Sequence, residues 1–316
     1  MASADVWLPV PPAEIGGLPD SLHYVRWDGE EEFPADPARC VFYAVPYLKG
    51  SEVAVRPLAH MPRVRVVQTL TAGTDHVASA VPGLPRGAVL CNARGVHDAG
   101  TAELALTLAL ASLRGVPGFV RAQDEGRWTP GFRPALADRT ALIVGYGAIG
   151  AAVEERLVPF EVEAVHRVAR TARAARRGPV HTLAELPRLL PGADVVFLTV
   201  PLTETTRGLV DADFLARMKD GALLVNVARG AVVDTGALLA ELESGRLRAA
   251  LDVTDPEPLP ADHPLWRAPG VLITPHVGGP TSAFLPRAKR LLRSQLRLFA
   301  AGEPLEHVVA VAGETG

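Results

Sequence analysis

Residues 140–157 read TALIVGYGAIGAAVEERL, and this stretch decides the fold of the chain. A short apolar strand, residues 140–144, runs directly into the glycine turn VGYGAIG, which opens a helix. A GxGxxG turn between a strand and a helix is typical of a dinucleotide site. Gly145 permits the tight turn, Gly147 lets the backbone approach a pyrophosphate, and Gly150 lets the helix pack closely on the strand.

The helix after this turn predicts where the phosphates bind. The first N–H groups of a helix have no partner within it, and with the helix dipole they favour an anion at that end. The alternative is an ordinary tight turn between a strand and a helix. The placement of the motif favours the dinucleotide site.

The rest of the chain alternates short apolar runs with helical segments. Before the turn we expect strands at residues 5–9, 40–45, 64–69 and 89–92, and after it at 162–166, 194–200, 222–227, 249–253 and 271–274. Helices are expected at residues 99–114, 182–190, 211–217, 235–244 and 284–301. Short continuous apolar strands are typical of a parallel sheet that helices cover on both faces. The predicted fold class is therefore α/β.

Composition excludes several classes of protein and of partner. The chain has 316 residues, of which 48% are hydrophobic and 21% charged, so it can build ordered cores. A net charge of −3 without a basic block argues against a nucleic acid partner. No uninterrupted apolar stretch is long enough to cross a membrane. No metal site is predicted.

The two cysteines indicate a reducing compartment. Cys40 and Cys91 lie in the apolar runs CVFYAV and AVLCNA, where we expect buried, reduced thiols. The N-terminus shows no basic region followed by an apolar run, the pattern of a signal peptide. A cytoplasmic protein is expected.

The segment VEAVHRVARTAR, residues 162–173, bears on the choice of dinucleotide. A carboxylate at the end of the second strand favours NAD because it accepts hydrogen bonds from the ribose. No acid follows Glu163 here, whereas Arg167, Arg170 and Arg173 supply cations for a 2′-phosphate. The alternative is a solvated, basic start of a helix. The sequence predicts NAD(P) as the cofactor, with a preference for NADP.

Three polar residues follow predicted strands of this region. Arg229 lies in VNVARG, Glu257 in DPEPL and His276 in TPHVGG. Because the carboxyl ends of parallel strands meet at one edge of a sheet, we expect these side chains to converge there. Arginine binds a carboxylate through a bidentate fork, and histidine titrates near neutrality and suits proton transfer. A carboxylate beside the histidine favours the imidazolium. This trio predicts proton and hydride chemistry on a small keto acid.

Five motifs in order resemble the D-isomer-specific 2-hydroxyacid dehydrogenase family. They are VGYGAIG (144–150), PLTETTRGLV (201–210), LLVNVARGAVVD (223–234), ALDVTDPEPLP (250–260) and LITPHVGGPT (272–281). The resemblance extends from about residue 64 to 309. It implies an oxidoreductase that transfers a hydride between NAD(P)H and a small 2-keto or 2-hydroxy acid, of the glyoxylate or hydroxypyruvate type.

The resemblance also implies residue roles. Arg229 would bind the substrate carboxylate, His276 would act as the acid/base, and Glu257 would be its partner. The segment QTLTAGTDHV (68–77) resembles the family's substrate loop, where backbone N–H groups of Ala72 and Gly73 would hold the carboxylate. The implied cofactor contacts are Gly145, Gly147, Ala148, Ile149, Gly150, Arg167, Val200, Pro201, Thr206, Val227, Ala228, Asp252 and Gly278.

The architecture implied by the resemblance is two Rossmann-like parallel-sheet domains. A cofactor domain, residues 97–281, would be inserted into a flavodoxin-like substrate domain formed by residues 1–96 and 282–316. A homodimer is the family expectation. Three features depart from the family pattern: the missing acid after the second strand, Thr199 where many members have histidine, and Glu161 where glycine is common.

Two other functions fit parts of the pattern. The same scaffold could oxidise another small anion such as formate or phosphite, although formate chemistry needs no such proton donor and typically lacks the glutamate partner. A dinucleotide-sensing interaction module would keep the cofactor site and bind a macromolecule instead.

Overall fold

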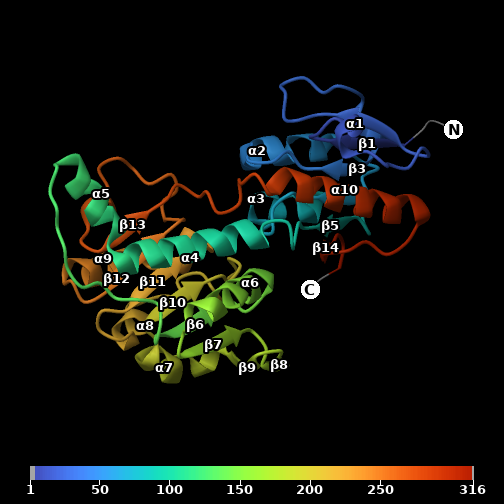
Figure 1. Cartoon of the computed structure of the whole chain (residues 1–316). Helices are drawn as coiled ribbons and strands as arrows, with labels where there is room; N and C mark the ends of the chain where they lie inside the picture. Colours follow the sequence, from blue (N-terminus) through green and yellow to red (C-terminus); the bar gives the residue numbers. More distant parts are fainter. Residues whose placement is uncertain (1–3, 315–316) are drawn as a thin grey trace. The chain divides into compact units, whose positions relative to one another are not determined.

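The computed structural model describes residues 4–314, and the chain divides into two compact units. One unit comprises Met1–His97 and Ser282–Gly316, within the described range, and the other comprises Asp98–Thr281. The second unit thus interrupts the chain of the first. Figure 1 labels the elements of both units.

The second unit contains an eight-stranded sheet. Its order is β13-β12-β11-β10-β6-β7-β9-β8, and all neighbours are parallel except β8 and β9. The strands are β6 (Thr140–Val144), β7 (Ala164–Ala169), β8 (Arg173–Ala175), β9 (Gly178–Thr182), β10 (Val195–Leu198), β11 (Leu223–Asn226), β12 (Arg248–Leu251) and β13 (Val271–Ile273). The strand order reverses between β6 and β10, and ligands of open α/β sheets bind at such a switch point.

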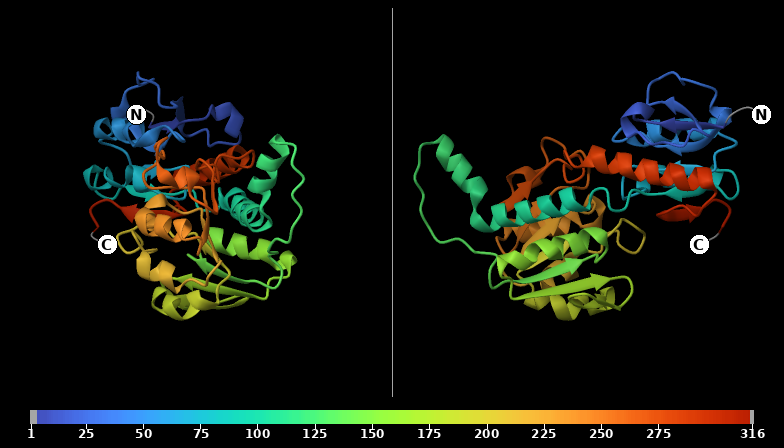
Figure 2. Two further views of the ribbon diagram at one scale, coloured as in Figure 1. Left: turned by 90° about the vertical axis from the view of Figure 1, so that its left-hand side faces the viewer. Right: turned by 45° about the vertical axis from the view of Figure 1, so that its right-hand side comes forward.

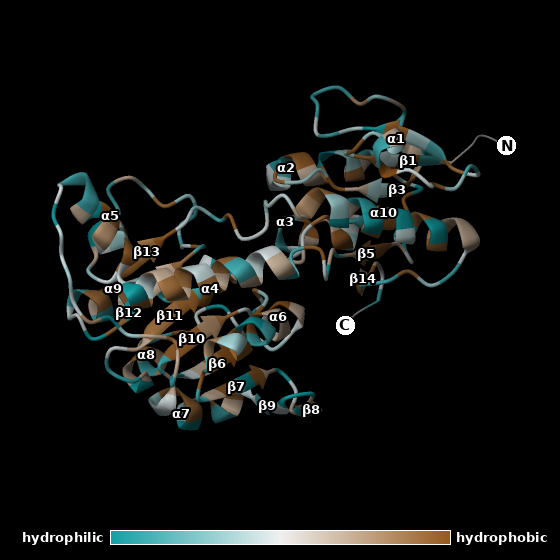
Figure 3. Ribbon diagram, in the orientation of Figure 1, coloured by the Kyte–Doolittle hydropathy of each residue, from teal (hydrophilic) through white to brown (hydrophobic). Residues whose placement is uncertain are grey.

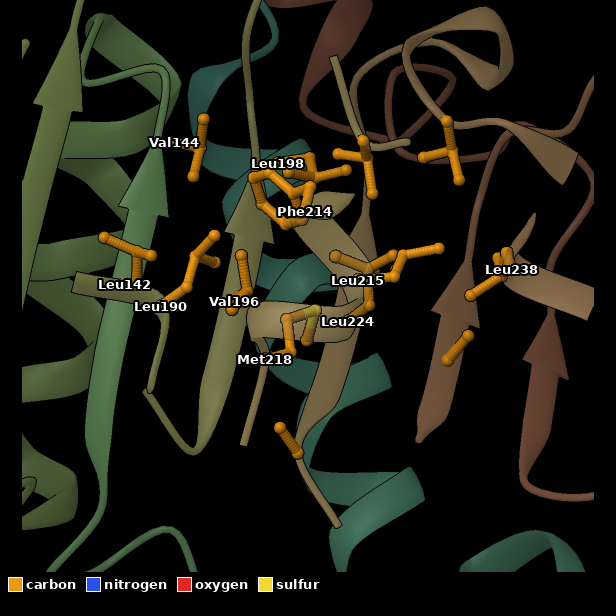
Figure 4. Packing of buried hydrophobic residues seen from close by; sticks show 14 of the residues in the cluster. Leu142, Val144, Leu190, Val196, Leu198, Phe214, Leu215, Met218, Leu224 and Leu238 are labelled. Carbon is orange, nitrogen blue, oxygen red and sulfur yellow. The ribbon is translucent and has the colours of Figure 1, made fainter. Parts of the chain in front are cut away.

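Helices cover both faces of this sheet, as the continuous apolar strands predict. On one face Leu142, Val196 and Leu224 pack against Phe214 and Leu215 (Figure 4). On the other face Ile143 and Phe197 belong to a core that also includes residues of the long helix α4. The helices of this unit are α4 (Asp98–Arg114), α5 (Val116–Asp124), α6 (Ala148–Leu157), α7 (Leu186–Leu189), α8 (Ala212–Arg217) and α9 (Thr235–Glu243).

The first unit has a six-stranded sheet in the order β14-β5-β4-β3-β1-β2. The order 2-1-3-4-5 of its parallel strands is that of flavodoxin-like folds, as expected. The C-terminal strand β14 pairs antiparallel with β5. The strands are β1 (Asp5–Leu8), β2 (His23–Arg26), β3 (Cys40–Ala44), β4 (Val66–Gln68), β5 (Val89–Cys91) and β14 (Val308–Val311), and the helices are α1 (Pro12–Ile15), α2 (Gly50–Val55), α3 (Asp75–Ala78) and α10 (Phe284–Ala301).

The helix α10 returns the chain to the core of the first unit. Ala288, Leu292 and Leu296 on one face of α10 are fully buried there. Gln295 on the same face donates to the side-chain oxygen of Gln68 in β4 at 2.7 Å. In Figure 3 strands of both sheets lie at the hydrophobic end of the colour scale. Both cysteines are buried and free, which confirms the prediction for them.

Short 3₁₀ helices connect several elements. They span Pro37–Arg39, Arg56–His60, Val81–Gly83, Val158–Phe160, Leu183–Glu185, Leu190–Gly192, Gly230–Val232 and Pro264–Arg267. Within residues 4–314 no single helix is long and apolar enough to cross a membrane. Helices α4 and α5 together would have the necessary length and composition, but they are bent by 65° relative to each other.

The sequence-based boundaries differ from the structure at several elements. The second strand of the cofactor region was expected to end at residue 166, but β7 continues to Ala169. Strands β2, β8, β9 and β14 and helix α5 were not predicted. The pattern of β2, HYVR, shows why: it is an edge strand without a fully buried residue, so it lacks an apolar run.

Candidate active site

The glycine turn lies between the carboxyl ends of β7 and β10. Gly145 has φ +109°, and a Cβ placed there would lie 2.5 Å from the backbone of Thr199 and Val200, so only glycine fits. The N–H groups of Gly145 and Tyr146 donate to the carbonyl of Val168 at 2.8 and 2.9 Å. On the other side the Thr199 hydroxyl donates to the carbonyl of Gly145 at 2.8 Å. The turn is therefore fixed at the switch point of the sheet.

The N-terminus of α6 is open for an anion. Gly147 is the exposed N-cap residue, a Cβ there would meet no atom within 4 Å, and no side chain caps the helix. Ala148 and Ile149 begin the first turn of the helix, and Gly150 lies so close to the carbonyl of Gly145 that a Cβ would be 2.6 Å away. An uncapped helix end behind a glycine turn is the donor set that a dinucleotide pyrophosphate requires.

The segment after β10 forms a closed turn beside this site. The Thr206 hydroxyl donates to the carbonyl of Pro201 at 2.6 Å and accepts from the N–H of Thr203 at 2.8 Å. Thr206 and Val200 are buried, whereas Pro201 is exposed. The hydroxyl of Thr206 thus holds the turn together, and Pro201 lies on its exposed side.

The structure corrects the place of Arg167. Because β7 continues past it, Arg167 lies inside the strand and not after it. Its guanidinium is buried and forms an ion pair with Glu154 of α6, itself only 1% exposed. A guanidinium held in this way is not available to a 2′-phosphate. Arg170 and Arg173, in contrast, are exposed after the end of β7.

Arg229 follows β11 in a turn that Asn226 holds. The side-chain oxygen of Asn226 accepts from the N–H of Ala228 at 3.0 Å, and its amide donates to the carbonyl of Arg229 at 3.1 Å. Val227 and Ala228 are buried, and the Arg229 guanidinium donates to the carbonyl of Ala228 at 2.7 Å. The sequence analysis did not single out Asn226, although its amide sets the path of this turn.

Glu257 and His276 form the ion pair expected from the sequence. Nδ1 of His276 lies 2.6 Å from Oε1 of Glu257, and both side chains are about two-fifths exposed. The hydrogen bond that His276 donates to Glu257 raises the pKa of His276 above its usual value, against desolvation and the nearby charge of Arg229. The same bond lowers the pKa of Glu257, and the positive charge of Arg229 adds to this. The trio Arg229, Glu257 and His276 therefore lies together at one sheet edge.

Asp252 holds the turn that carries His276. Its carboxylate is 3% exposed and accepts from the Thr274 hydroxyl at 2.6 Å and from the N–H groups of Val277 and Gly278 at 2.9 Å each. The N–H of His276 donates to the carbonyl of Asp252 at 2.8 Å. Asp252, expected as a cofactor contact, thus has its two oxygens engaged within the protein. Thr274 in the TPH motif was not singled out from the sequence.

Ala72 and Gly73 belong to the other unit, in the turn between β4 and α3. The Asn92 side chain donates to the carbonyl of Ala72 at 2.9 Å, and the Thr71 hydroxyl donates to that of Gly73 at 2.6 Å. These bonds fix the backbone of the expected substrate loop.

Comparison with known proteins identifies the family of the chain. The family model described as D-isomer specific 2-hydroxyacid dehydrogenase, NAD binding domain, matches residues 106–278. The human protein named glyoxylate reductase/hydroxypyruvate reductase is 32% identical over 292 residues, which cover 89% of this chain and 88% of that protein.

Two solved structures extend the similarity to the whole chain. A D-isomer specific 2-hydroxyacid dehydrogenase from Xanthobacter autotrophicus, in complex with NADPH and MES, is 30% identical, with a TM-score of 0.80 and 98% of each chain covered. An NADPH-dependent glyoxylate/hydroxypyruvate reductase from Sinorhizobium meliloti, in complex with NADP and sulfate, is 26% identical, with a TM-score of 0.81 and coverage of 97% of this chain and 98% of that one. The chain belongs to the D-isomer specific 2-hydroxyacid dehydrogenase family, and it is an NAD(P)-dependent oxidoreductase of small 2-hydroxy and 2-keto acids.

Proposed function

We propose that the protein reduces a small 2-keto acid of the glyoxylate or hydroxypyruvate type. The observation that carries this proposal is the ion pair of His276 with Glu257, 2.6 Å apart, close enough to Arg229 for its charge to act on both. An acid, a carboxylate that keeps it protonated, and a cation for the substrate carboxylate are the groups that reduction of a keto acid requires.

Each residue of the trio has a defined task in this reaction. When bound, the reduced nicotinamide supplies the hydride. His276 donates a proton to the carbonyl oxygen as that oxygen gains charge, and Glu257 stabilises the imidazolium form. Arg229 binds the substrate carboxylate through its planar fork. In the other unit, the backbone N–H groups of Ala72 and Gly73 are proposed as substrate contacts.

NADP is the proposed cofactor. The absence of an acid at the end of β7 and the exposed guanidinium groups of Arg170 and Arg173 support this choice. The cofactor contacts proposed at the glycine turn are the N–H groups of Ala148, Ile149 and Gly150, with Gly147 leaving the backbone open to the pyrophosphate. Glu257 argues against formate oxidation, which needs no paired proton donor.

A homodimer is proposed as the assembly. Helix α5 and the segment after it extend away from the sheet of their unit (Figure 2). Trp128 and Phe132 in this segment are 94% and 104% exposed, and Phe119 and Val120 of α5 are partly exposed too. Large apolar side chains this exposed are typical of surfaces that another chain covers, and a second copy is the partner we propose. A cytoplasmic location is also proposed, supported by the free thiols of Cys40 and Cys91.

The test of the reaction follows the loss of nicotinamide absorbance as NADPH or NADH is oxidised. The purified protein is mixed with either dinucleotide and a panel of small 2-keto acids. Oxidation of NADPH by glyoxylate or hydroxypyruvate is the expected result. Tight dinucleotide binding without turnover on any member of the panel would instead favour the dinucleotide-sensing function.

A further inference from the structure

Tyr146, the central residue of the Gly145-Tyr146-Gly147 turn, is the meeting point of a charged network. Its hydroxyl donates to Glu154, and the buried guanidinium of Arg167 pairs with the other oxygen of that carboxylate. Arg167 also lies 5.9 Å from the centroid of the Tyr146 ring. The ring is therefore held from α6 through Glu154 and from β7 through Arg167.

Arg173 contacts the same tyrosine from the β8–β9 hairpin. Its guanidinium donates to the carbonyl of Tyr146 and lies 6.0 Å from the ring centroid. Pairing of Arg173 with Val180 in the β8–β9 hairpin fixes the backbone from which the side chain extends. Unlike Arg167, this guanidinium has no carboxylate partner within residues 4–314, and it is exposed.

The two arginines of the network differ in whether a carboxylate neutralises them. Glu154 neutralises Arg167 in the interior, so that pair adds little net charge at the loop. Arg173 keeps its positive charge beside the loop, held by a carbonyl and by the face of an aromatic ring. A guanidinium already held near its target loses less side-chain entropy when an anion binds.

We propose that Tyr146 is a specificity-determining residue for the dinucleotide: it is the platform that holds Arg173 beside the cofactor loop to receive a 2′-phosphate. This inference rests on the proposed preference for NADP. It assigns the selectivity to a residue of the glycine turn itself, at a position that the GxGxxG pattern leaves open. Arg167 and Glu154 act through Tyr146 as positioning residues.

The experiment measures dissociation constants of NADP⁺ and NAD⁺ for the full chain by calorimetry. Arg173→Ala should weaken NADP⁺ by about tenfold and leave NAD⁺ unchanged, as expected for one charge-assisted hydrogen bond. Tyr146→Leu should weaken NADP⁺ alone by about threefold, the effect of a cation–π contact at an exposed site. In the double variant the loss should equal that of Arg173→Ala, because the platform matters only through the arginine.

Two variants serve as controls. Tyr146→Phe keeps the ring and should retain the preference for NADP⁺. Arg176→Ala removes the same charge from the β8–β9 hairpin, but Arg176 pairs with Glu155 and should not affect either dinucleotide. An equal effect of Arg176→Ala would show that general electrostatics, and not the platform, sets the preference.

The outcomes separate this inference from the proposed function. A wild-type protein that binds NAD⁺ more tightly would refute the NADP choice and with it the platform. If the wild type prefers NADP⁺ and Arg173→Ala removes the preference, but Tyr146→Leu weakens both dinucleotides equally, the NADP choice stands and the platform is refuted. The platform would also be refuted if the losses of NADP⁺ affinity in the two single variants multiplied in the double variant.

Discussion

His276 occupies a backbone conformation that few side chains adopt. Its φ is +54°, in the left-handed region, where a residue other than glycine or asparagine is uncommon. The turn is kept there by Asp252, whose carbonyl and carboxylate bind the N–H groups of residues 276, 277 and 278. Such local strain persists only where the surroundings fix it, and it is frequent at functional sites. Asp252 therefore fixes the backbone that orients His276, the residue proposed as the acid.

Replacement of His276 by alanine should abolish most turnover. Loss of a general acid typically reduces kcat by about 10²–10⁴-fold. The dissociation constant for the dinucleotide should stay unchanged, because the glycine turn lies on other strands. Steady-state kinetics together with calorimetry check both expectations. A variant with wild-type kcat would remove His276 from the mechanism.

The pKa of His276 gives a second prediction, for the pH dependence. Reduction requires the protonated imidazole, so activity is present below the pKa of His276 and lost as the pH rises through it. Glu257 raises that pKa, mainly through the hydrogen bond. In Glu257→Gln the pKa should fall, and the alkaline limb of kcat/KM should move to lower pH. Asp255→Asn, an exposed acid of the same loop, is the matched control and should keep the wild-type profile; an unmoved limb in Glu257→Gln would contradict the role of the pair.

At the scale of elements, two turns at neighbouring strand ends bring Arg229 and Glu257 of the trio together. Arg229 follows β11 and Glu257 follows β12, and the two turns touch at Gly230. A Cβ on Gly230 would lie 1.8 Å from the carbonyl oxygen of Thr254, so the Arg229 turn rests directly on the backbone that leads to Glu257. The sequence shows that a glycine follows Arg229, and this backbone contact explains why glycine is needed there.

Gly230→Ala tests that contact. The new methyl group must displace the backbone at Thr254, and overpacking of this kind costs about 1–3 kcal/mol in the free energy of unfolding. The displacement should also separate Glu257 from Arg229 and lower kcat/KM. Urea unfolding and steady-state kinetics measure the two effects. Gly192→Ala, where a Cβ meets nothing within 4 Å, should change neither, and a Gly230→Ala protein as stable and active as the wild type would contradict the argument.

At the scale of the whole molecule, a segment of the second unit exposes two large aromatic side chains. Trp128 and Phe132 are almost fully exposed, and their burial between two copies would remove a large apolar area from water. Replacement of both by serine should therefore convert the proposed homodimer to a monomer, as measured by light scattering. Val158→Ser, at an exposed apolar residue elsewhere in the same unit, should leave the assembly unchanged. A wild-type protein that is monomeric at micromolar concentration would contradict the homodimer.

The sequence alone determined the features that depend on local signals. The glycines at 145 and 150 lie where a Cβ would come within 2.6 Å of backbone atoms, and continuous apolar strands specify burial on both faces of a sheet. The order of the motifs predicted the family, and the strand ends predicted that Arg229, Glu257 and His276 lie at one edge. These inferences succeeded because each depends on a few consecutive residues.

Only the tertiary structure decided which groups are paired. The position of Arg167 in the sequence, after the glycine turn, suggested a cofactor ligand. Its partner Glu154 lies on α6, and the packing of α6 decides that Glu154 faces Arg167. The edge strand β2 carries little apolar signal, and β14, although its sequence VVAV is apolar, belongs to the sheet only through its pairing with the distant strand β5. The contact of Gly230 with Thr254 likewise joins the segments that follow two different strands. Charge pairing and close backbone approach depend on distances in space, which a linear pattern does not contain.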